Sequence, residues 1–316
     1  MMNFVTRISR KTLTNILIIS AAFLLVGIVF WQFRGKMKLS EVTKPTMAAA
    51  GMPTNGTVAN IPKQADNKGA SSVSSAGESS PEKEAVPAYQ TMYPNLYAGA
   101  IAPTISPKKK TVYLTFDDGP SNLTIPLLDI LDTYHVKATF FVIGRTDSQS
   151  LEDMKEIVNR GHSIGVHSYT HQYKQIYASP AAFLEDFAKM HDLIEKTTGV
   201  DTKIYRYAGG SVNGYNRTTA KEIITEMNRR GYLYYDWNVD SGDAQTGSNA
   251  KSIYRDVING VHRNNESVVL FHNTKFKRNT LNDIAKIIKT LQKQGYTFEK
   301  LDSSVDSTPY RFRNIP

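Results

Sequence analysis

Leu114-Thr115-Phe116-Asp117-Asp118-Gly119-Pro120-Ser121-Asn122 is the stretch on which the expected fold depends. Thr111–Phe116 has the β-branched and aromatic residues of a buried strand, and Gly119-Pro120 turns the chain directly after it. Two neighbouring carboxylates therefore stand at a strand end, where their repulsion needs an opposing charge. A bound cation supplies that charge, with one carboxylate as its ligand and the other free as a base. The alternative is a solvated acidic turn.

The chain has 316 residues, no cysteine and a formal net charge of +9. The lack of cysteine excludes disulfides, thiolate catalysis and cysteine zinc sites. Residues 1–106 hold 10 Lys/Arg against 5 Asp/Glu, and residues 107–316 hold 28 against 24. The part expected to fold is thus only mildly basic, which argues against nucleic acid as the main partner and suits an anionic cell envelope.

An apolar run of 18 residues, Ile16–Phe33, lies between basic residues near the N-terminus. At about 1.5 Å per residue it just spans a bilayer core. A cleavable signal peptide is the alternative, but the small-residue site Ala48-Ala49-Ala50 lies too far downstream. We expect residues 1–39 to form a cytoplasmic stub and an uncleaved single-pass anchor in the cell membrane, with the rest of the chain outside the cell and facing the wall.

The next segment, Ser40–Pro87, contains no aromatic residue and is rich in Ala, Ser, Gly, Pro, Thr and Asn. It cannot bury enough apolar surface to offset the entropy lost on ordering. We expect residues 40–106 to be a flexible linker ending in a tyrosine-containing leader segment, Tyr89–Tyr97, that packs on the domain. The catalytic domain is expected over residues 107–305, followed by a tail, residues 306–316.

Strand-like and helix-like patterns alternate from residue 107 onward. Seven strands are predicted, at Thr111–Phe116, Thr139–Ile143, Ser163–Val166, Lys203–Tyr205, Leu233–Trp237, Ser267–Phe271 and Thr297–Lys300. Six helices are predicted, at Ile125–Tyr134, Ser150–Arg160, Ala181–Thr198, Arg217–Arg230, Lys251–Val261 and Leu281–Gln294. These βα repeats predict an α/β fold with a parallel sheet, and the pattern alone does not distinguish a barrel from an open sheet.

Polar clusters stand where five of the predicted strands end. They are Asp117-Asp118, His167–His171, Arg206–Gly210, Asp236–Asp243 and Phe271-His272-Asn273. Parallel α/β folds build active sites at the carboxyl ends of their strands, because the loops converge there. The sequence therefore predicts one site assembled from these clusters.

His167 and His171 are four residues apart, so on a helical turn they point the same way and can share a cation. Taken alone, this spacing is also compatible with two structural histidines. With Asp118 the pair forms a set of two histidines and one carboxylate that leaves coordination positions open. Catalytic zinc sites use such sets, and so do non-haem iron oxygenases.

The remaining candidates each have a structural alternative. His272 follows an apolar run and is either a core histidine or a general acid, while Arg206 is either a surface cation or the partner of an ionised aspartate. Trp237 belongs either to the core or to a sugar-binding wall. Asp243 can reach back to orient a histidine. We expect ordinary packing or surface roles for the other histidines, which are His135, His162, His191 and His262.

In this order the five clusters resemble the polysaccharide deacetylase family, carbohydrate esterase family 4, whose catalytic domain is the NodB homology domain. The resemblance covers about residues 110–302 and is to bacillus-type peptidoglycan N-acetylglucosamine deacetylases in particular. It implies a distorted (β/α) barrel with about seven parallel strands and one divalent metal ion, zinc first and cobalt, nickel or manganese as alternatives. It implies Asp117 as base, Asp118, His167 and His171 as metal ligands, His272 as acid, Arg206 as the partner of Asp117, and Asp243 as the partner of His272.

Two positions depart from the family pattern. The third motif usually continues from its arginine with a proline and an aromatic residue, whereas Tyr207, Ala208 and Gly209 follow here. The fifth motif usually has Asp after its His, whereas this chain has Asn273. Because a nearby carboxylate raises the pKa of an imidazole, Asn273 is expected to leave His272 with a lower pKa. If residue 273 faces away, Asp243 alone sets that pKa.

We therefore predict a membrane-anchored, monomeric, metal-dependent enzyme that removes N-acetyl groups from cell-wall glycan, with peptidoglycan acetylglucosamine ahead of acetylmuramic residues or chitin-type oligosaccharides. Tyr207, Trp237 and Leu270 are the predicted substrate contacts. The rivals are an iron oxygenase, a glycosidase and a non-catalytic glycan-binding relic. A glycosidase fits poorly because its carboxylates must flank a bond, whereas neighbouring Asp117 and Asp118 are expected to project to opposite sides of an extended chain.

Overall fold

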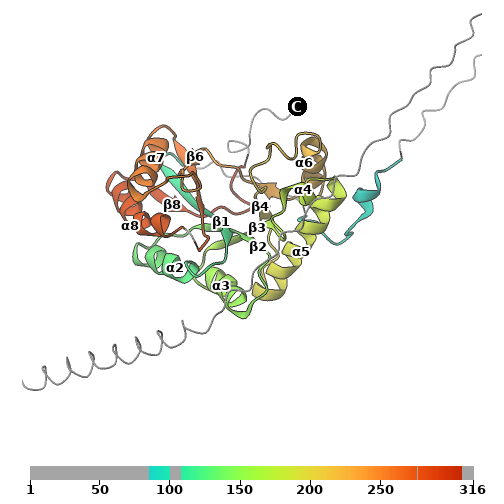
Figure 1. The fold of residues 1–316 in the computed structure, drawn as a ribbon, viewed down its shortest axis with the longest axis horizontal. Coiled ribbons are helices and arrows are strands. Elements are labelled where there is room, and N and C mark those ends of the chain that lie inside the picture. Colours follow the sequence, from blue (N-terminus) through green and yellow to red (C-terminus); the bar gives the residue numbers. More distant parts are fainter. Residues whose placement is uncertain (1–84, 100–107, 276, 308–316) are drawn as a thin grey trace, which may run out of the picture. The chain divides into compact units, whose positions relative to one another are not determined.

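A computed structural model describes residues 85–99, 108–275 and 277–307 of the chain (Figure 1). The predicted anchor at Ile16–Phe33, most of the predicted linker, and the tail from residue 308 onward lie outside the described residues. Within the described ranges, none of the helices combines the length and the apolar character needed to cross a membrane.

A parallel sheet forms the centre of the domain, and β1 (Thr111–Gly119) pairs with three other strands, β2, β7 and β8. The sheet runs in the order β5-β4-β3-β2-β1-β7-β6, with β8 paired to the start of β1. The other strands are β2 (Thr139–Ile143), β3 (Ser163–Ser168), β4 (Ile204–Tyr205), β5 (Leu233–Tyr234), β6 (Val239–Asp240), β7 (Glu266–His272) and β8 (Thr297–Glu299). This half-barrel of parallel strands confirms the predicted (β/α) fold.

The predicted strand Leu233–Trp237 is wrong in its extent, because the structure divides this region between the two ends of the sheet. β5 pairs with β4, and β6 pairs with β7. Asn238 ends the crossing between them, since its side chain accepts a hydrogen bond from Val268 N at 2.8 Å and its own N–H donates to Val268 O at 3.2 Å. In the described part of the chain β5 and β6 do not pair with each other, so the sheet stays open between them.

The helices lie around the outside of the sheet (Figure 1). All six predicted helices are present, as α2 (Thr124–Thr133), α3 (Ser148–Asn159), α5 (Pro180–Thr198), α6 (Ala220–Arg229), α7 (Ala250–His262) and α8 (Arg278–Lys293). The short helices η1 (Ala88–Thr91) and α4 (Tyr173–Ile176) were not predicted. Helix α5 begins as its sequence indicates, with Ser179 Oγ accepting from Ala182 N and Pro180 in the first turn, and Gly199 ends it in the left-handed conformation.

The two faces of the sheet bury different clusters. Val112, Leu114 and Phe116 of β1 belong to the main core under the helices. Because side chains alternate along a strand, Tyr113 and Asp117 face the other way. Tyr113 joins a second apolar cluster inside the half-barrel, formed with Phe141, Ile204, Leu233, Tyr235, Val268, Leu301 and Val305. The inner face is thus apolar near the amino ends of the strands and polar near their carboxyl ends, where the five predicted clusters stand.

The leader segment packs against the end of helix α6 through Arg229 and, above all, Arg230, in line with the predicted packing of Tyr89–Tyr97. The fully buried Arg230 pairs with Glu226 at 2.6 Å. Its other N–H groups donate to leader carbonyls, at 2.7 Å to Met92 and 3.0 Å to Tyr93, with longer bonds to Leu96 and Tyr89. The leader is therefore part of the folded domain.

Candidate active site

Both aspartates at the end of β1 face the same centre. Asp118 has φ of 68°, and the β1–β2 pairing shifts register between Asp117 and Gly119. This bulge breaks the alternation of side chains, so Asp117 Oδ2 and Asp118 Oδ1 lie 3.9 and 3.4 Å from His167 Nε2. The expectation that neighbouring aspartates project to opposite sides was wrong, because it assumed a regular extended strand. That objection to a glycosidase therefore falls away.

Asp118, His167 and His171 present one ligand atom each, and all three atoms lie within 4.8 Å of one another. Asp118 Oδ1 is 3.4 Å from His167 Nε2 and 3.1 Å from His171 Nε2. Zinc–nitrogen distances of about 2.0–2.1 Å separate tetrahedral ligands by about 3.3 Å. The buried Asp118 Oδ1 makes no hydrogen bond within the described residues, although both rings face it. These residues therefore fit a shared cation better than a hydrogen-bonded network.

The pKa shifts of Asp118 and His167 are also consistent with a cation site. Burial raises the pKa of Asp118, but the facing His167 and His171 rings outweigh burial and hold that pKa well below its usual range. Burial lowers the pKa of His167, but Asp117 and Asp118 outweigh it and raise that pKa. His167 Nδ1 lies 3.0 Å from the carbonyl of Arg206, so Nδ1 is the protonated nitrogen and Nε2 is left for a metal.

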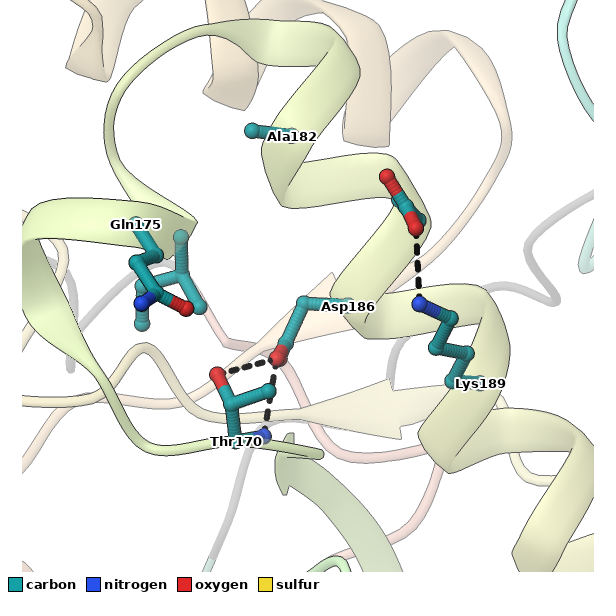
Figure 2. Close-up of a pocket in the computed structure, with 7 residues that line it drawn as sticks. Thr170, Gln175, Ala182, Asp186 and Lys189 are labelled. Carbon is teal, nitrogen blue, oxygen red and sulfur yellow. Dashed lines mark hydrogen bonds and ion pairs between the residues drawn. The ribbon is translucent and has the colours of Figure 1, made fainter.

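The segment between the two histidines is not helical, contrary to the prediction. His167 lies on β3 and His171 follows it in a bend. One carboxylate of helix α5, Asp186, shapes this bend (Figure 2). Asp186 accepts four hydrogen bonds, from Ser168 Oγ at 2.7 Å, Tyr169 N at 2.8 Å, Thr170 N at 2.8 Å and Thr170 Oγ1 at 2.7 Å. The two ligands converge because of this distant aspartate.

Sequence reasoning missed Asp186, although its sequence context carries a signal. The residue is buried on the same helix as Phe183 and Phe187, which are core residues. An acid on the apolar face of an amphipathic helix needs hydrogen-bond partners, which makes it a candidate for a positioning role. A small pocket beside it opens between this helix and Thr170, Gln175 and Ile176.

Arg206 holds Asp117 from inside the half-barrel. Its Nη1 donates to Asp117 Oδ1 at 3.0 Å, and both side chains are almost completely buried. It also donates to Thr115 Oγ1 at 2.7 Å, Tyr235 O at 2.7 Å and Asp236 O at 3.1 Å, with its guanidinium 4.5 Å from the Phe141 ring centroid. Arg206 therefore fixes the position of the Asp117 side chain through a buried ion pair.

His272 stands opposite Asp117 in the β1–β7 register. Its Nδ1 lies 2.7 Å from Asp243 Oδ1, and its backbone N–H donates to Asp243 Oδ2 at 2.9 Å. Thr280 donates to the same carboxylate at 2.8 Å. Burial lowers the pKa of His272, but the bond to Asp243 and its charge outweigh burial and raise that pKa. Nδ1–H is therefore fixed as the donor to Asp243, and Nε2 is left for proton transfer.

Asn273 faces away from His272. Its side chain accepts from Ser121 Oγ at 3.1 Å and donates to Thr124 Oγ1 at 2.8 Å, while its N–H donates to Asp117 O at 2.7 Å. The expectation that Asn273 lowers the pKa of His272 is therefore wrong, because residue 273 points into the turn after β1. Among the described residues, Asp243 is the carboxylate that forms an ion pair with the imidazole.

The three predicted substrate contacts differ in their placement. Tyr207 is 1% exposed, and its ring packs in the core against Phe183. We therefore correct its assignment, since that ring offers no surface to a substrate. Trp237 is half-buried beside Arg206, with 5.7 Å between guanidinium and ring centroid. Leu270 is buried on β7, two residues before His272 and on the same face of the strand.

The other histidines lie outside this site. Burial lowers the pKa of His162 to about 4, and its Nδ1 accepts from Ala138 N. His191 pairs with Asp201 at 3.1 Å. His135 and His262 are exposed. The prediction of packing or surface positions for these four residues is confirmed.

Comparison with known proteins gives concordant matches. Residues 104–228 match the family model described as polysaccharide deacetylase. The catalytic domain of a peptidoglycan N-acetylglucosamine deacetylase from Eubacterium rectale ATCC 33656 is 40% identical, with a TM-score of 0.64 over 68% of this chain and 98% of that one. A peptidoglycan-N-acetylglucosamine deacetylase of Bacillus cereus is 32% identical over 60% of this chain and 85% of its own. The peptidoglycan-N-acetylmuramic acid deacetylase PdaA of Bacillus subtilis is 29% identical over 62% and 71%.

Proposed function

This chain belongs to the polysaccharide deacetylase family, a family of metal-dependent hydrolases, and on that premise we propose that it removes the acetyl group from N-acetylglucosamine residues of peptidoglycan. One observation carries the proposal. Asp117 and His272 face each other on neighbouring strands, beside Asp118, His167 and His171. A base and an acid on two sides of one small centre are what amide hydrolysis requires.

Asp118, His167 and His171 would hold one divalent cation, for which we propose zinc, with cobalt, nickel or manganese as alternatives. When bound, the cation supplies Lewis-acid activation of water and of the acetamide carbonyl. The choice of zinc rests on the donor set, because two imidazoles and one carboxylate are common ligands of catalytic zinc.

The proton transfers are assigned to this chain's own residues. Asp117, held in place by Arg206, takes a proton from water as the water oxygen attacks the acetamide carbon. The carbon–nitrogen bond then breaks, and His272 Nε2 donates its proton to the departing sugar nitrogen. The products are acetate and an amino sugar. Asp243 acts through His272, because it fixes the ring and stabilises its protonated form.

Two side chains are proposed to contact the substrate. Leu270 shares the strand face of His272 and supplies an apolar surface for the acetyl methyl group. Trp237 lies beside Arg206 with part of its indole exposed, and it supplies a wall for the sugar ring.

The test is acetate release from two defined glycans, an N-acetylglucosamine polymer and a peptidoglycan fragment in which only the muramic residue is acetylated. The protein is stripped with a chelator and reloaded with each of the four metals in turn. We expect release from the first glycan and a return of activity on reloading. Release from the second glycan alone would reverse the sugar assignment. A metal-loaded protein that releases acetate from neither glycan would be a binding relic, and the proposed activity would be wrong.

The location of the enzyme is a separate proposal that rests on sequence. The apolar run Ile16–Phe33 and the polar segment Ser40–Pro87 support a single-pass anchor with a monomeric catalytic domain facing the cell wall. Protease added to wall-stripped cells should cut within Ser40–Pro87 and release the domain. Full protection of the chain, under conditions that cut a known surface protein, would reverse this topology.

A further inference from the structure

An exposed tyrosine stands close to the candidate metal site. Among the described residues, the large hydrophobic side chains that are exposed are Val86, Tyr97 and Tyr215. Tyr97 lies under the guanidinium groups of Arg229 and Arg230, whereas 54% of Tyr215 is exposed. Exposed aromatic surface beside a catalytic centre is a common mark of ligand binding.

Two ring contacts connect Tyr215 to a metal ligand. The ring of Tyr215 stacks on Tyr173, with centroids 5.2 Å apart and planes 19° apart. Tyr173 in turn meets His171 edge to face, with centroids 5.2 Å apart. Tyr215 is therefore two ring contacts from the cation site, which suits contact with a sugar next to the one that reacts.

The loop that carries Tyr215 is held by its own side chains. Asn213 Oδ1 accepts from Tyr215 N at 2.8 Å, and Asn213 Nδ2 donates to the carbonyls of Ala208 and Gly210 at 3.2 Å each. Asn216 Oδ1 accepts from Asn213 N at 2.8 Å. A ring that is already fixed loses little conformational entropy when a ligand binds it.

Gly209, one of the residues that depart from the family's third motif, leaves space for the Tyr173 ring on which Tyr215 stacks. Gly209 has φ of 77°, and a Cβ atom there would lie 2.9 Å from Cε1 of Tyr173. Most L-residues would be strained at that φ, and their side chains would displace the ring that supports Tyr215. The sequence Tyr207-Ala208-Gly209 in place of the family's proline and aromatic residue is thus coupled to the Tyr173–Tyr215 stack.

We infer that Tyr215, supported by Tyr173, is a binding platform for a pyranose ring of the glycan strand, next to the residue that is deacetylated. Pyranose rings have apolar C–H faces that pack on aromatic rings, and a stack of two tyrosines offers a broad and rigid surface for this contact. The inference rests on the proposed function for the identity of the glycan. It adds a subsite that recognises chain length.

The first test compares Tyr215→Ala and Tyr215→Phe on N-acetylglucosamine oligomers of increasing length, in the zinc-loaded protein. Tyr215→Ala should raise KM for the longer oligomers roughly 2- to 12-fold and leave kcat/KM for the shortest substrate unchanged. Tyr215→Phe should behave as the wild type, because it keeps the ring. Tyr97→Ala, an exposed tyrosine on the leader segment, is the control and should keep the wild-type length dependence.

The second test measures binding without turnover, by calorimetric titration of metal-free protein with the longest oligomer. Tyr215→Ala should bind it more weakly by the same factor. Equal affinity of Tyr215→Ala and wild type, or equal damage from Ala and Phe, would overturn the platform. If wild type binds the oligomer in a Tyr215-dependent way and the zinc-loaded protein releases no acetate from it, the platform stands and the proposed activity fails.

Discussion

Asp118 and Asp243 are both largely buried aspartates that face histidine rings, but they differ in the hydrogen bonds that their carboxylate oxygens accept. Asp243 accepts hydrogen bonds from His272 Nδ1, His272 N and Thr280 Oγ1. Asp118 Oδ1 has two rings within 3.4 Å and makes no hydrogen bond in the part of the chain that the structure describes. The His272–Asp243 pair is therefore complete as it stands, whereas Asp118, His167 and His171 form a set of ligands that still needs a cation.

The two sites also differ in which residues hold their side chains in position. His272 and Asp243 stabilise each other directly, with one further hydrogen bond to Asp243 from Thr280. The positions of His167 and His171 depend on Asp186, which accepts its hydrogen bonds from Ser168, Tyr169 and Thr170 in the bend between them. A site built in this way should lose its metal through changes at a distance, whereas the proton-transfer pair should be sensitive mainly to its own two side chains.

The largest expected effect is on the ligand side. His171→Ala should remove both bound metal and acetate release, because two ligands no longer close the site. Metal content after dialysis against excess zinc is the measurement. His262→Ala, which removes an exposed histidine outside the site, is the control and should keep full occupancy. Undiminished metal in His171→Ala would reject the ligand assignment.

Asp117→Asn should separate the base from the ligands. The variant should keep its metal and lose about 10²- to 10⁴-fold in kcat, since an amide cannot accept the proton. Metal content and single-turnover acetate release on the same sample measure both effects. If this variant loses its metal while Asp118→Asn keeps it, the roles of the two aspartates are exchanged.

Asp186→Asn tests the distant support. The amide of Asn would place an N–H group against backbone and hydroxyl donors that now meet a carboxylate oxygen, so the bend should loosen. Zinc affinity should then fall by about 10- to 100-fold, which is the usual range for residues that orient metal ligands. Activity should return at high zinc. The matched control is Glu185→Gln on the same helix, where an exposed carboxylate pairs with Lys189. An unchanged zinc affinity in Asp186→Asn would show that the bend holds without this carboxylate.

The smallest expected effect is a shift in pH dependence. Asp243 raises the pKa of His272, so Asp243→Asn should lower that pKa and leave less His272 protonated at a given pH. Because the acid must be protonated to act, the alkaline limb of the kcat/KM profile should move to lower pH. Asn273→Asp is the control and should leave that limb in place, since residue 273 faces Ser121 and Thr124. A shift in Asn273→Asp as large as that in Asp243→Asn would contradict this geometry.

Sequence alone predicted the alternation of strands and helices and the face on which the site stands. These features follow from local periodicity and from the rule that loops at the carboxyl ends of parallel strands converge. All of the predicted ligands and proton-transfer residues come together on that face, because each lies at the end of a strand or within three residues of it.

What the sequence could not predict depends on contacts between distant segments or on backbone irregularity. The bulge at Asp118 is set by pairing with β2, and the bend before His171 is set by a helix 15 residues further on, at Asp186. Local pattern also extended β5 to Trp237 and missed β6, because Tyr235–Trp237 has strand-like residues but crosses between the two ends of the sheet. Asn273 was misassigned for the same reason, since its direction depends on the turn after β1.

The clamp between Arg230 and the leader segment has a mechanical consequence. Any tension on the chain ahead of Ala88 is borne by the carbonyls of Tyr89, Met92, Tyr93 and Leu96, and so passes into helix α6 before it reaches β1. We therefore expect the strand that carries the two active-site aspartates to be shielded from that tension. A fragment cut at residue 107 would keep every candidate catalytic residue, but it would leave the buried Arg230 guanidinium with Glu226 and without its four leader carbonyls, and it would remove the part of the domain that takes up the load.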